Sequence, residues 1–328
     1  MAKLKDIADM TGFSVATVSR VLNHDDSFNV SEKTRLKVLK AAEKLNYITL
    51  SQRQRKKMVI GLAYWYSSAD EVIDSHYLSI RSAIEEHCDA NDIELKLFYL
   101  HKKNHEDMTQ VNLDGLIALG KYSDDEITAL WKLNSNFVLV DCDTNNPEID
   151  VVMVDLEAAT KNVIDYLHET GITSIGFIGG IESTIDGKVV EDVRFETFIK
   201  YGDIDHDAVY LGRLTPVSGY EIMNNIIKSG NIKPAYIVAT DVIAIGCLRA
   251  LNEHKIKIPQ EVSLISYNNI LLSEYLAPSL TTVDLNADQL GIAATEMMLE
   301  RIKNERTIAK KTYLPTRLIK RETTLVKK

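Results

Sequence analysis

The residues whose types and spacing suggest chemistry lie first of all in one short run, LKDIADMTGFSVATVSRVLN, at positions 4–23. One face of its second half carries small and polar side chains: Ser14, Ala16, Thr17, Ser19, Arg20 and Asn23. Such a face permits close approach to another surface. A helix-turn-helix that inserts its second helix into the major groove of DNA needs a face of this kind.

The elements that must position this face are also indicated by the pattern. Two short amphipathic helices joined by a turn at Gly12 bring together a small apolar core: Ile7, Ala8, Val18, Val21 and Leu22. A third helix is expected after Ser31, a suitable N-cap, and its apolar stripe comprises Leu36, Val38, Leu39, Ala42 and Leu45. We therefore expect an all-α head at residues 1–48.

The charges of the chain are unevenly distributed. The 328 residues carry a formal net charge of −9. Residues 1–57 contain 12 Lys and Arg against 6 Asp and Glu, a net charge of +6, and the remaining residues have a net charge of −15. A basic head on an acidic body concentrates the attraction for phosphate at one end. Residues 49–57, TLSQRQRKK, are expected to be a basic linker, or a helix that forms only on DNA.

From Met58 onward, apolar strand-like runs alternate with amphipathic segments, which predicts doubly wound parallel sheets in residues 58–328. Strands are expected at 58–66, 94–100, 115–120, 137–141, 151–155, 174–180, 235–241, 262–268 and 281–285, and helices at 75–91, 124–133, 156–170, 189–201, 218–229, 242–254 and 288–304. We expect two halves, with the chain crossing between them near 155–160, 284 and 312.

In folds of this kind a ligand lies at the carboxyl ends of the strands, and a cleft separates the two halves. The candidates there are Tyr64, Trp65 and Tyr66 after the first strand, Asp141, Asp241 and Asn268 after later strands, and Arg194 on the helix after SIGFIGG. Helix capping is the alternative role for the Asp and Asn residues, because both types favour such positions. Packing in the cavity wall is the alternative for the aromatic residues.

Composition and motifs exclude several classes of protein. With 45% hydrophobic and 26% charged residues, the chain has an ordinary globular composition, and no apolar run reaches the roughly 20 residues that span a bilayer. The chain begins without an apolar signal core, so a cytoplasmic location is expected. His101 and His105 lack accompanying carboxylates or thiols, GFIGG lacks the spacing of a dinucleotide-binding loop, and no enzyme motif appears. We therefore expect no metal, no cofactor and no catalysis.

Longer motifs extend these patterns. The run SVATVSRVLN is followed by VSEKTRLKVLKAAEKLNY, and the body contains GFIGG, VATDVIAIGCLRAL, IPQEVSLISYN, PSLTTVDL and LPTRLIKRETT. Over essentially its whole length the chain resembles the LacI/GalR family of transcriptional repressors. The resemblance implies a helix-turn-helix head and a periplasmic-binding-protein-like α/β body of two doubly wound parallel-sheet subdomains. The implied partners are double-stranded operator DNA, a small sugar effector such as a galactoside, and a second copy of the chain. The implied location is the nucleoid in the cytoplasm, and no membrane partner is implied.

The resemblance also assigns roles within the head. In the family the second helix reads base edges, and Val15, Ala16 and Arg20 match its specificity positions. Arg20 carries the donor fork that suits O6 and N7 of guanine, whereas Val15 and Ala16 offer apolar contact, for example to a thymine methyl group. Contacts to phosphate or to the DNA backbone are implied for Ser14, Thr17, Ser19, Asn23 and Tyr47.

The segment after Tyr47 departs from the family pattern. Members of the family usually have a hinge helix there, with an Ala–Leu pair whose Leu wedges into the minor groove. This chain has Thr49 and Leu50 with no Ala–Leu pair, and a shorter, basic linker. A basic segment can hold phosphates without kinking DNA, so no residue is assigned to intercalation.

For the body, the resemblance implies polar side chains at strand ends that bind sugar hydroxyls. The matching positions are Tyr77, as a wall for the sugar ring, and Asp141, Arg194, Asp241 and Asn268. Arg194 is the principal candidate because a planar guanidinium can donate to two adjacent hydroxyls. Asn268 stands where lactose-binding members have Asp, so the identity of the sugar is not carried over.

Two alternative functions remain open. Members of the co-repressor type bind DNA more tightly with a ligand or a partner, and the sequence does not reveal the sign of the response. A sugar-binding receptor without a regulatory role is the alternative from another class, and the basic head argues against it.

Overall fold

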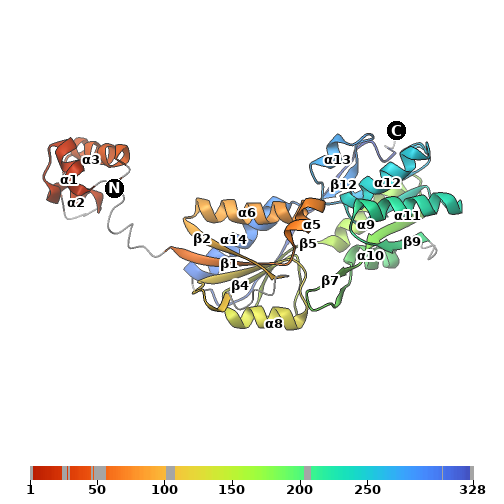
Figure 1. Cartoon of the computed structure of the whole chain (residues 1–328), viewed down its shortest axis with the longest axis horizontal. Helices are drawn as coiled ribbons and strands as arrows, with labels where there is room; N and C mark the ends of the chain where they lie inside the picture. The colour runs from red at the N-terminus through yellow and green to blue at the C-terminus, as the bar shows by residue number, and fades with distance from the viewer. Residues whose placement is uncertain are drawn as a thin grey trace. The chain divides into compact units, whose positions relative to one another are not determined.

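The computed structural model describes residues 3–23, 28, 30–45, 47, 57–100, 108–202, 208–304 and 306–325. The chain forms two compact units, Met1–Lys57 and Met58–Lys328, which we call the head and the body (Figure 1). The linker predicted at 49–57, apart from Lys57, lies outside the described residues, as do His101 and His105.

Three helices build the head: α1 (Leu4–Thr11), α2 (Val15–Leu22) and α3 (Glu32–Lys44). Gly12 ends α1 with φ 75°, a left-handed conformation that a residue without a Cβ adopts at little cost, and the chain turns there. The hydroxyl of Ser14 caps α2 by accepting the N–H of Thr17, and the hydroxyl of Ser31 caps α3 through the N–H of Thr34. The predicted helix-turn-helix is confirmed.

The core of the head contains the predicted apolar residues and differs from the prediction in α3. The buried residues are Ile7, Ala8, Val18, Val21, Leu22, Val38, Ala41 and Ala42. Leu36 and Leu39 are 54% and 37% exposed, so these two members of the predicted stripe do not enter the core. Because 3.6 residues make one helical turn, Leu39 and Leu36 lie roughly 100° and 160° around α3 from the buried Val38.

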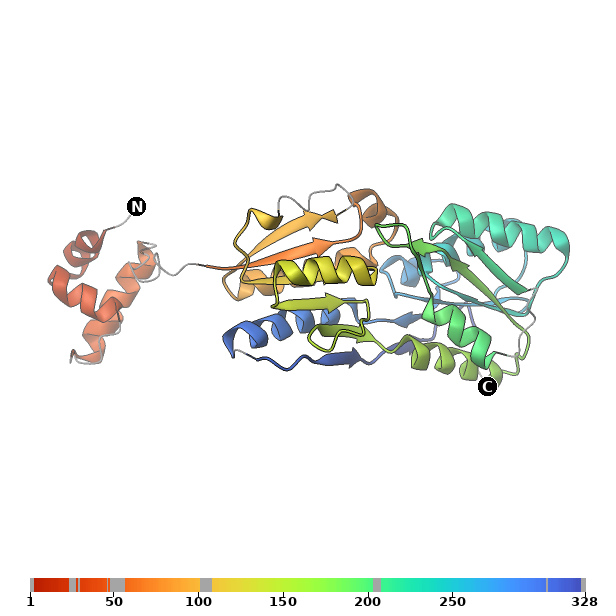
Figure 2. The same cartoon turned by 90° about the horizontal axis from the view of Figure 1, so that it is seen from below.

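The first half of the body, the N-lobe, is a six-stranded parallel sheet with the order β2-β1-β3-β4-β5-β13. Its strands are β1 (Met58–Tyr64), β2 (Ile93–Tyr99), β3 (Gly115–Leu119), β4 (Phe137–Val140), β5 (Asp150–Val154) and β13 (Lys311–Leu314). Helices α6 (His76–Ala90) and α14 (Ala287–Lys303) pack together on one face, α8 (Asp124–Leu133) covers the other, and the short α5 (Ser68–Ile73) precedes α6 (Figure 1, Figure 2). The central strands β3 and β4 are buried on both faces, as their continuous apolar runs predict.

The second half, the C-lobe, has a sheet with the order β9-β6-β10-β11-β12-β14. Its strands are β6 (Ile175–Gly180), β9 (Val209–Gly212), β10 (Ala235–Val238), β11 (Ser263–Tyr267), β12 (Thr281–Asp284) and the antiparallel β14 (Arg317–Ile319). Its helices are α9 (Leu156–Glu169), α10 (Val193–Tyr201), α11 (Pro216–Ser229), α12 (Asp241–Glu253) and α13 (Leu272–Tyr275). Helix α9 packs on α10, and α11 packs on α12.

The chain passes between the two sheets after β5, after β12 and again between β13 and β14. All neighbouring strands of both sheets are parallel except β12 and β14, so the carboxyl ends of the parallel strands gather at one edge of each sheet. Residues that follow these strands in both lobes line the same cavities, which therefore lie at the boundary between the lobes.

A two-stranded hairpin after β6 differs from the predicted helix at 189–201. Val189 and Val190 form β8 and pair with β7 (Glu182–Ser183), so that α10 begins only at Val193, after the cap residue Asp192. The hairpin reaches from the C-lobe toward α8 (Figure 1). Elements as short as β7, β8, α5 and α13 contain too few residues to show a periodic pattern.

Asp241 does not line the cavities, contrary to the expectation for an effector contact. Its side chain is fully buried in the first turn of α12, and the cap of that helix is Thr240. Four groups donate to the carboxylate: the hydroxyls of Ser266, Ser273 and Thr282 and the N–H of Ile270. The structure therefore gives Asp241 a structural role, in which it joins α12 to β11, β12 and the segment around α13.

We predict that Asp241→Ala destabilises the body more than Asp241→Asn does. Alanine leaves the N–H of Ile270 buried without an acceptor, at a cost of about 1–3 kcal/mol for this group alone. The carbonyl oxygen of asparagine can still accept that N–H, while the neighbouring hydroxyls rotate to accept the amide. Thermal unfolding followed by circular dichroism measures the difference, and equal melting temperatures for the two variants would contradict the assigned role.

A pH dependence follows from the same group. Burial raises the pKa of Asp241 to about 6, although the hydrogen bonds oppose the shift. Because the unfolded value is about 3.9, the folded state binds more protons between these values, and the stability contributed by Asp241 falls as the pH rises from about 4 to 6. We expect the Tm of Asp241→Asn to gain on that of the wild type over this interval; a constant difference between the two proteins from pH 4 to 7 would contradict the raised pKa.

Candidate functional site

The first candidate surface is the exposed face of α2 in the head. Because Val18, Val21 and Leu22 face the core, the opposite side of α2 remains exposed, and Val15 is 44% exposed there. The exposed or half-buried residues of this face are those expected from the sequence: Ser14, Val15, Ala16, Thr17, Ser19, Arg20 and Asn23. Their positions follow from one helical period and from the cap at Ser14.

Polar groups on this face differ in the contacts that they already make within the head. The Ser14 hydroxyl caps α2 and also lies 2.9 Å from the Thr17 hydroxyl, so both are held in place by the helix start. Asn23 donates to Ser19 at 3.3 Å. The Arg20 guanidinium lies 5.2 Å from the centre of the Phe28 ring, which orients the base-reading candidate without covering it.

Tyr47 lies next to the core of the head. Its N–H donates to the carbonyl of Ala42 at 2.9 Å, which fixes the chain just after α3. The side chain is half-buried and packs against the apolar core. The predicted contact with a DNA backbone therefore falls to the part of the side chain that stays accessible.

The second candidate is a pair of adjoining cavities at the boundary of the two lobes. The inner chamber, of about 40 Å³, is lined mainly by polar side chains, including Tyr77, Asp141, Arg194 and Asn268. The outer cavity, of about 620 Å³, opens beside Trp65 and Tyr66. Tyr66, Glu182 and Leu214 line both, so the outer cavity leads to the inner chamber.

Asp141 and Lys121 form the charged pair of the N-lobe side of the chamber. Asp141 follows β4 directly, with φ 59°, and its carboxylate lies 2.8 Å from the Lys121 ammonium and accepts the Tyr77 hydroxyl at 2.5 Å. Burial disfavours the charged carboxylate, but the Lys121 ammonium and the hydrogen bonds from Lys121 and Tyr77 outweigh it and hold the pKa of Asp141 below its usual value. The carboxylate is therefore charged at neutral pH and can accept further hydrogen bonds from a ligand.

Arg194 supplies the cation of the C-lobe side. Its Nε and Nη2 donate to the carboxylate of Asp192 at 2.8 and 3.0 Å, and Nη1 donates to the carbonyl of Ala239 at 2.6 Å. The guanidinium also lies 5.6 Å from the centre of the Tyr267 ring. These contacts fix the plane of the guanidinium at the wall of the chamber, which is the preorganisation that bidentate donation to a ligand requires.

One hydrogen bond spans the chamber from lobe to lobe. Asn268, at the end of β11, donates to Asp74 of the N-lobe at 3.2 Å. The other oxygen of Asp74 accepts the N–H of His76 at 3.0 Å. Asn268 has φ 107°, a left-handed conformation that is uncommon outside glycine. A ligand between the lobes would compete directly with this bond.

Sequence reasoning missed part of the chamber. Lys121 follows β3 and Glu182 follows β6, so the rule used for Asp141 and Asn268 would also have found them. Asp74 directly follows α5 and His76 is the first residue of α6, and the sequence pattern there gives no signal of a site. The Nδ1 atom of His76 is buried without a hydrogen-bond partner among the described residues, and burial lowers the pKa of this imidazole, which leaves a neutral group for a ligand to meet.

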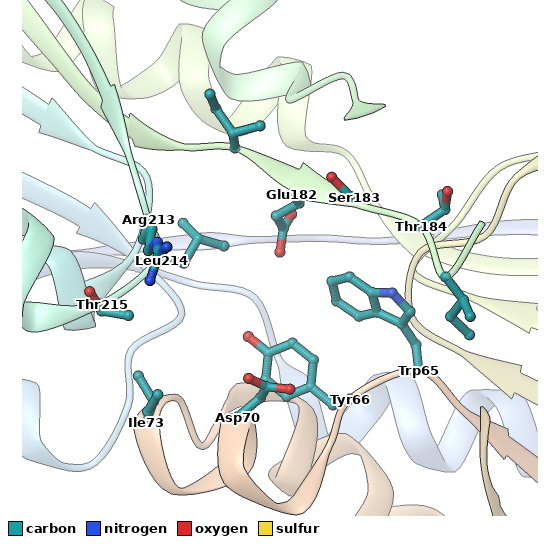
Figure 3. A pocket seen from close by; sticks show the side chains of 12 residues that line it. Trp65, Tyr66, Asp70, Ile73, Glu182, Ser183, Thr184, Arg213, Leu214 and Thr215 are labelled. Carbon is teal, nitrogen blue, oxygen red and sulfur yellow. The ribbon is translucent and has the colours of Figure 1, made fainter. Parts of the chain in front are cut away.

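The aromatic run after β1 divides between core and cavity. Tyr64 is fully buried in β1, whereas Trp65 and Tyr66 line the outer cavity (Figure 3). In the described part of the chain, no group of His, Cys, Asp or Glu side chains could hold a metal ion. None of the helices in that part is long and apolar enough to cross a membrane.

Comparisons with known proteins match both the head and the body of the chain. Residues 3–49 match the model of the bacterial regulatory proteins of the lacI family, and residues 164–324 match the periplasmic binding protein-like domain. The HTH-type transcriptional regulator GalR of Lacticaseibacillus casei is 37% identical over 99% of this chain and 100% of its own length. The HTH-type transcriptional regulator GanR of Bacillus subtilis (strain 168) is 35% identical over 98% of this chain and 99% of its own.

Solved structures share the fold over the whole chain. The crystal structure of the lac repressor dimer bound to operator and the anti-inducer ONPF has a TM-score of 0.75 at 24% identity and covers 99% of both chains. The complex of the transcriptional regulator CelR with cellobiose has a TM-score of 0.72 at 21% identity and covers 98% of this chain and 100% of that one. With its helix-turn-helix head and its two-lobed body, the chain belongs to the lacI family of bacterial regulatory proteins and is a DNA-binding transcriptional regulator.

Proposed function

We propose that the protein represses a sugar-utilisation operon and leaves its operator when a small sugar, in particular a galactoside, binds between the lobes of the body. The observation that carries the proposal is the inner chamber, which is lined by hydrogen-bonding groups from both lobes and by aromatic side chains. Sugars offer hydroxyls to such groups and an apolar ring face to Tyr77 and Tyr66. A metabolite regulator of this kind acts at the nucleoid, in the cytoplasm.

Similarity to named relatives supports the proposed kind of effector and the proposed action on DNA. GalR and GanR are among the similar regulators, and the HTH-type transcriptional repressor MelR of Bacillus subtilis (strain 168) is 31% identical over 98% of this chain. The runs KLKDIA, IRSAIEEHC and SLISYNNI also resemble the Ebg β-galactosidase-operon repressor. These similarities favour a galactoside as the effector and repression as the action on DNA.

The proposed mechanism is a shift between two arrangements of the lobes. A sugar that binds one arrangement more tightly raises its population in proportion to the difference in affinity. The bond between Asn268 and Asp74 is the contact that a ligand would exchange. In a dimer, this rearrangement would change the spacing of the two heads, and operator half-sites tolerate little change in spacing.

A homodimer is part of the proposal. Helix-turn-helix proteins read half-sites with two-fold symmetry, which requires two heads. Around α13, the apolar residues Leu271, Leu272 and Tyr275 are 75%, 58% and 73% exposed. An exposed apolar cluster of this kind suits a second copy of the chain as its cover.

We predict that Arg20→Ala lowers the affinity for the operator by about 1–3 kcal/mol, or roughly 5–150-fold, because a bidentate contact to guanine is lost. Binding to unrelated DNA should change much less. Gel-shift titrations on operator and on scrambled DNA measure both affinities. Lys40→Ala, which removes one exposed charge from α3, is the matched control. If Arg20→Ala weakens both DNAs by the same factor, Arg20 contacts phosphate and not a base.

We predict that Arg194→Lys raises the sugar concentration needed for operator release by about tenfold or more, since hydrogen bonds to a charged group contribute about 1.5–3 kcal/mol. Lysine keeps a positive charge beside Asp192 but lacks the planar fork. Operator release during titration with each active sugar is the measurement, and operator affinity without sugar reports the integrity of the variant. Arg249→Ala, on the exposed side of α12, is the control. If the variant releases the operator at the same sugar concentrations as the wild type, Arg194 does not bind the sugar.

A further inference from the structure

The two cavities differ in size in a way that bears on the length of the ligand. A cavity needs about 10–15 Å³ to hold one water molecule, so the inner chamber of about 40 Å³ has room for roughly three. The outer cavity of about 620 Å³ falls within the range of about 300–1,000 Å³ that is typical of pockets for drug-sized small molecules. Room for a second ring is therefore already present outside the chamber, before any movement of the lobes.

An aromatic wall runs without interruption from the outer cavity into the chamber. The ring centres of Trp65 and Tyr66 are 5.1 Å apart, those of Tyr66 and Tyr77 are 4.7 Å apart, and those of Tyr77 and His76 are 5.4 Å apart. Trp65 and Tyr66 line the outer cavity, and the other two rings line the chamber. Successive sugar rings can each lay an apolar C–H face on such a wall.

Polar groups face this wall from the C-lobe. Figure 3 shows Trp65 and Tyr66 on one side of the outer cavity, with the hairpin strand that carries Glu182 and Ser183 across from them and Arg213 at a third side. Carboxylate, hydroxyl and guanidinium groups offer both acceptors and donors to the hydroxyls at a ring edge. The outer cavity thus has the same two kinds of lining as the chamber, aromatic and hydrogen-bonding.

The charges of the lining favour a neutral ligand. The charged residues of the outer cavity are Asp70, Glu182 and Arg213, and those of the chamber add Asp74 and Asp141 against Lys121 and Arg194. Lys121 and Arg194 are already paired with Asp141 and Asp192. A phosphate group would meet four carboxylates and three cations, at short range and in a partly desolvated site, where like charges repel strongly.

We propose that the effector is an uncharged oligosaccharide of two or more rings, with its terminal ring at the inner chamber and the next ring on Trp65 and Tyr66 in the outer cavity. The inference rests on the proposed sugar response and adds the length and charge of the ligand. A monosaccharide can offset the free-energy cost of breaking the polar contacts of the chamber only with the contacts of its one ring. A longer sugar gains contacts in the outer cavity that help to offset this cost.

The test is isothermal titration calorimetry of the full chain with two matched series and one charged probe. The series are galactose, galactobiose and galactotriose, and glucose, cellobiose and cellotriose; the probe is galactose 6-phosphate. We expect the disaccharide of the active series to bind at least tenfold more tightly than its monosaccharide, about 1.4 kcal/mol, and the phosphate to bind more weakly than galactose. Equal affinity for one ring and two, or tighter binding of the phosphate, overturns the oligosaccharide inference and leaves the sugar response standing. If no sugar of either series binds and none releases the operator, the proposed function itself fails.

Variants assign the second ring to the outer cavity. Arg213→Ala and Trp65→Leu should each lower the ratio of disaccharide to monosaccharide affinity by about fivefold or more, because only the longer ligand reaches these side chains. Arg249→Ala, an exposed arginine elsewhere in the C-lobe, should leave the ratio unchanged. Trp65 also packs on Gly120, so its replacement can lower the melting temperature of the body. In that case the affinity ratio of Arg213→Ala is the test of where the second ring binds. An unchanged ratio in Arg213→Ala with a disaccharide that still binds more tightly would place the second ring elsewhere.

Discussion

Burial of charge between the two lobes is the constraint on which the body depends. Asp74, Asp141 and Arg194 are each less than 10% exposed. Moving such a group out of water costs several kcal/mol unless a partner and hydrogen bonds replace the water. Each lobe meets this requirement with a pair of its own, Asp141 with Lys121 and Arg194 with Asp192. The boundary is therefore not a dry apolar interface, and a polar molecule can enter by exchanging hydrogen bonds.

The same constraint relates the chamber to the sheets. Each charged or amide group at its wall is held at or near the end of a parallel strand or at a helix start, so its position depends on the sheet or helix of its own lobe. A bound sugar that bridges both walls would replace the contact from Asn268 to Asp74 and fix one arrangement of the lobes. A bound ligand therefore acts on the rest of the molecule by changing the relative position of the lobes. In a dimer, this movement can change the spacing of the two heads.

Some of this site could be predicted from the sequence and some could not. Asp141 and Asn268 follow from the rule that ligands lie at the carboxyl ends of parallel strands, Arg194 follows from the family resemblance, and the structure brings all three to one chamber. The sequence allowed a structural role for Asp241 but not its partners, because these come from strands and a segment that lie 25–41 positions further along the chain. The short elements beside the cavity have no period to detect. For the same reason the helix predicted at 189–201 begins four residues later than predicted, because Val189 and Val190 form a short strand before it.

A second set of contacts joins the lobes at the hairpin. At the tip of the hairpin, Asp186 accepts the Ser123 hydroxyl at 2.7 Å and donates its N–H to Glu126 at 2.7 Å, and Lys188 pairs with Asp125. The side chains of Lys188 and Asp125 are 55% and 86% exposed, and pairs of this kind contribute about 0–1 kcal/mol each. Leaving a buried carboxylate such as Asp74 without its donors costs more than that. A ligand that exchanges the contact between Asn268 and Asp74 therefore acts on a buried group, whereas the ion pair at the hairpin is exposed to solvent and weak.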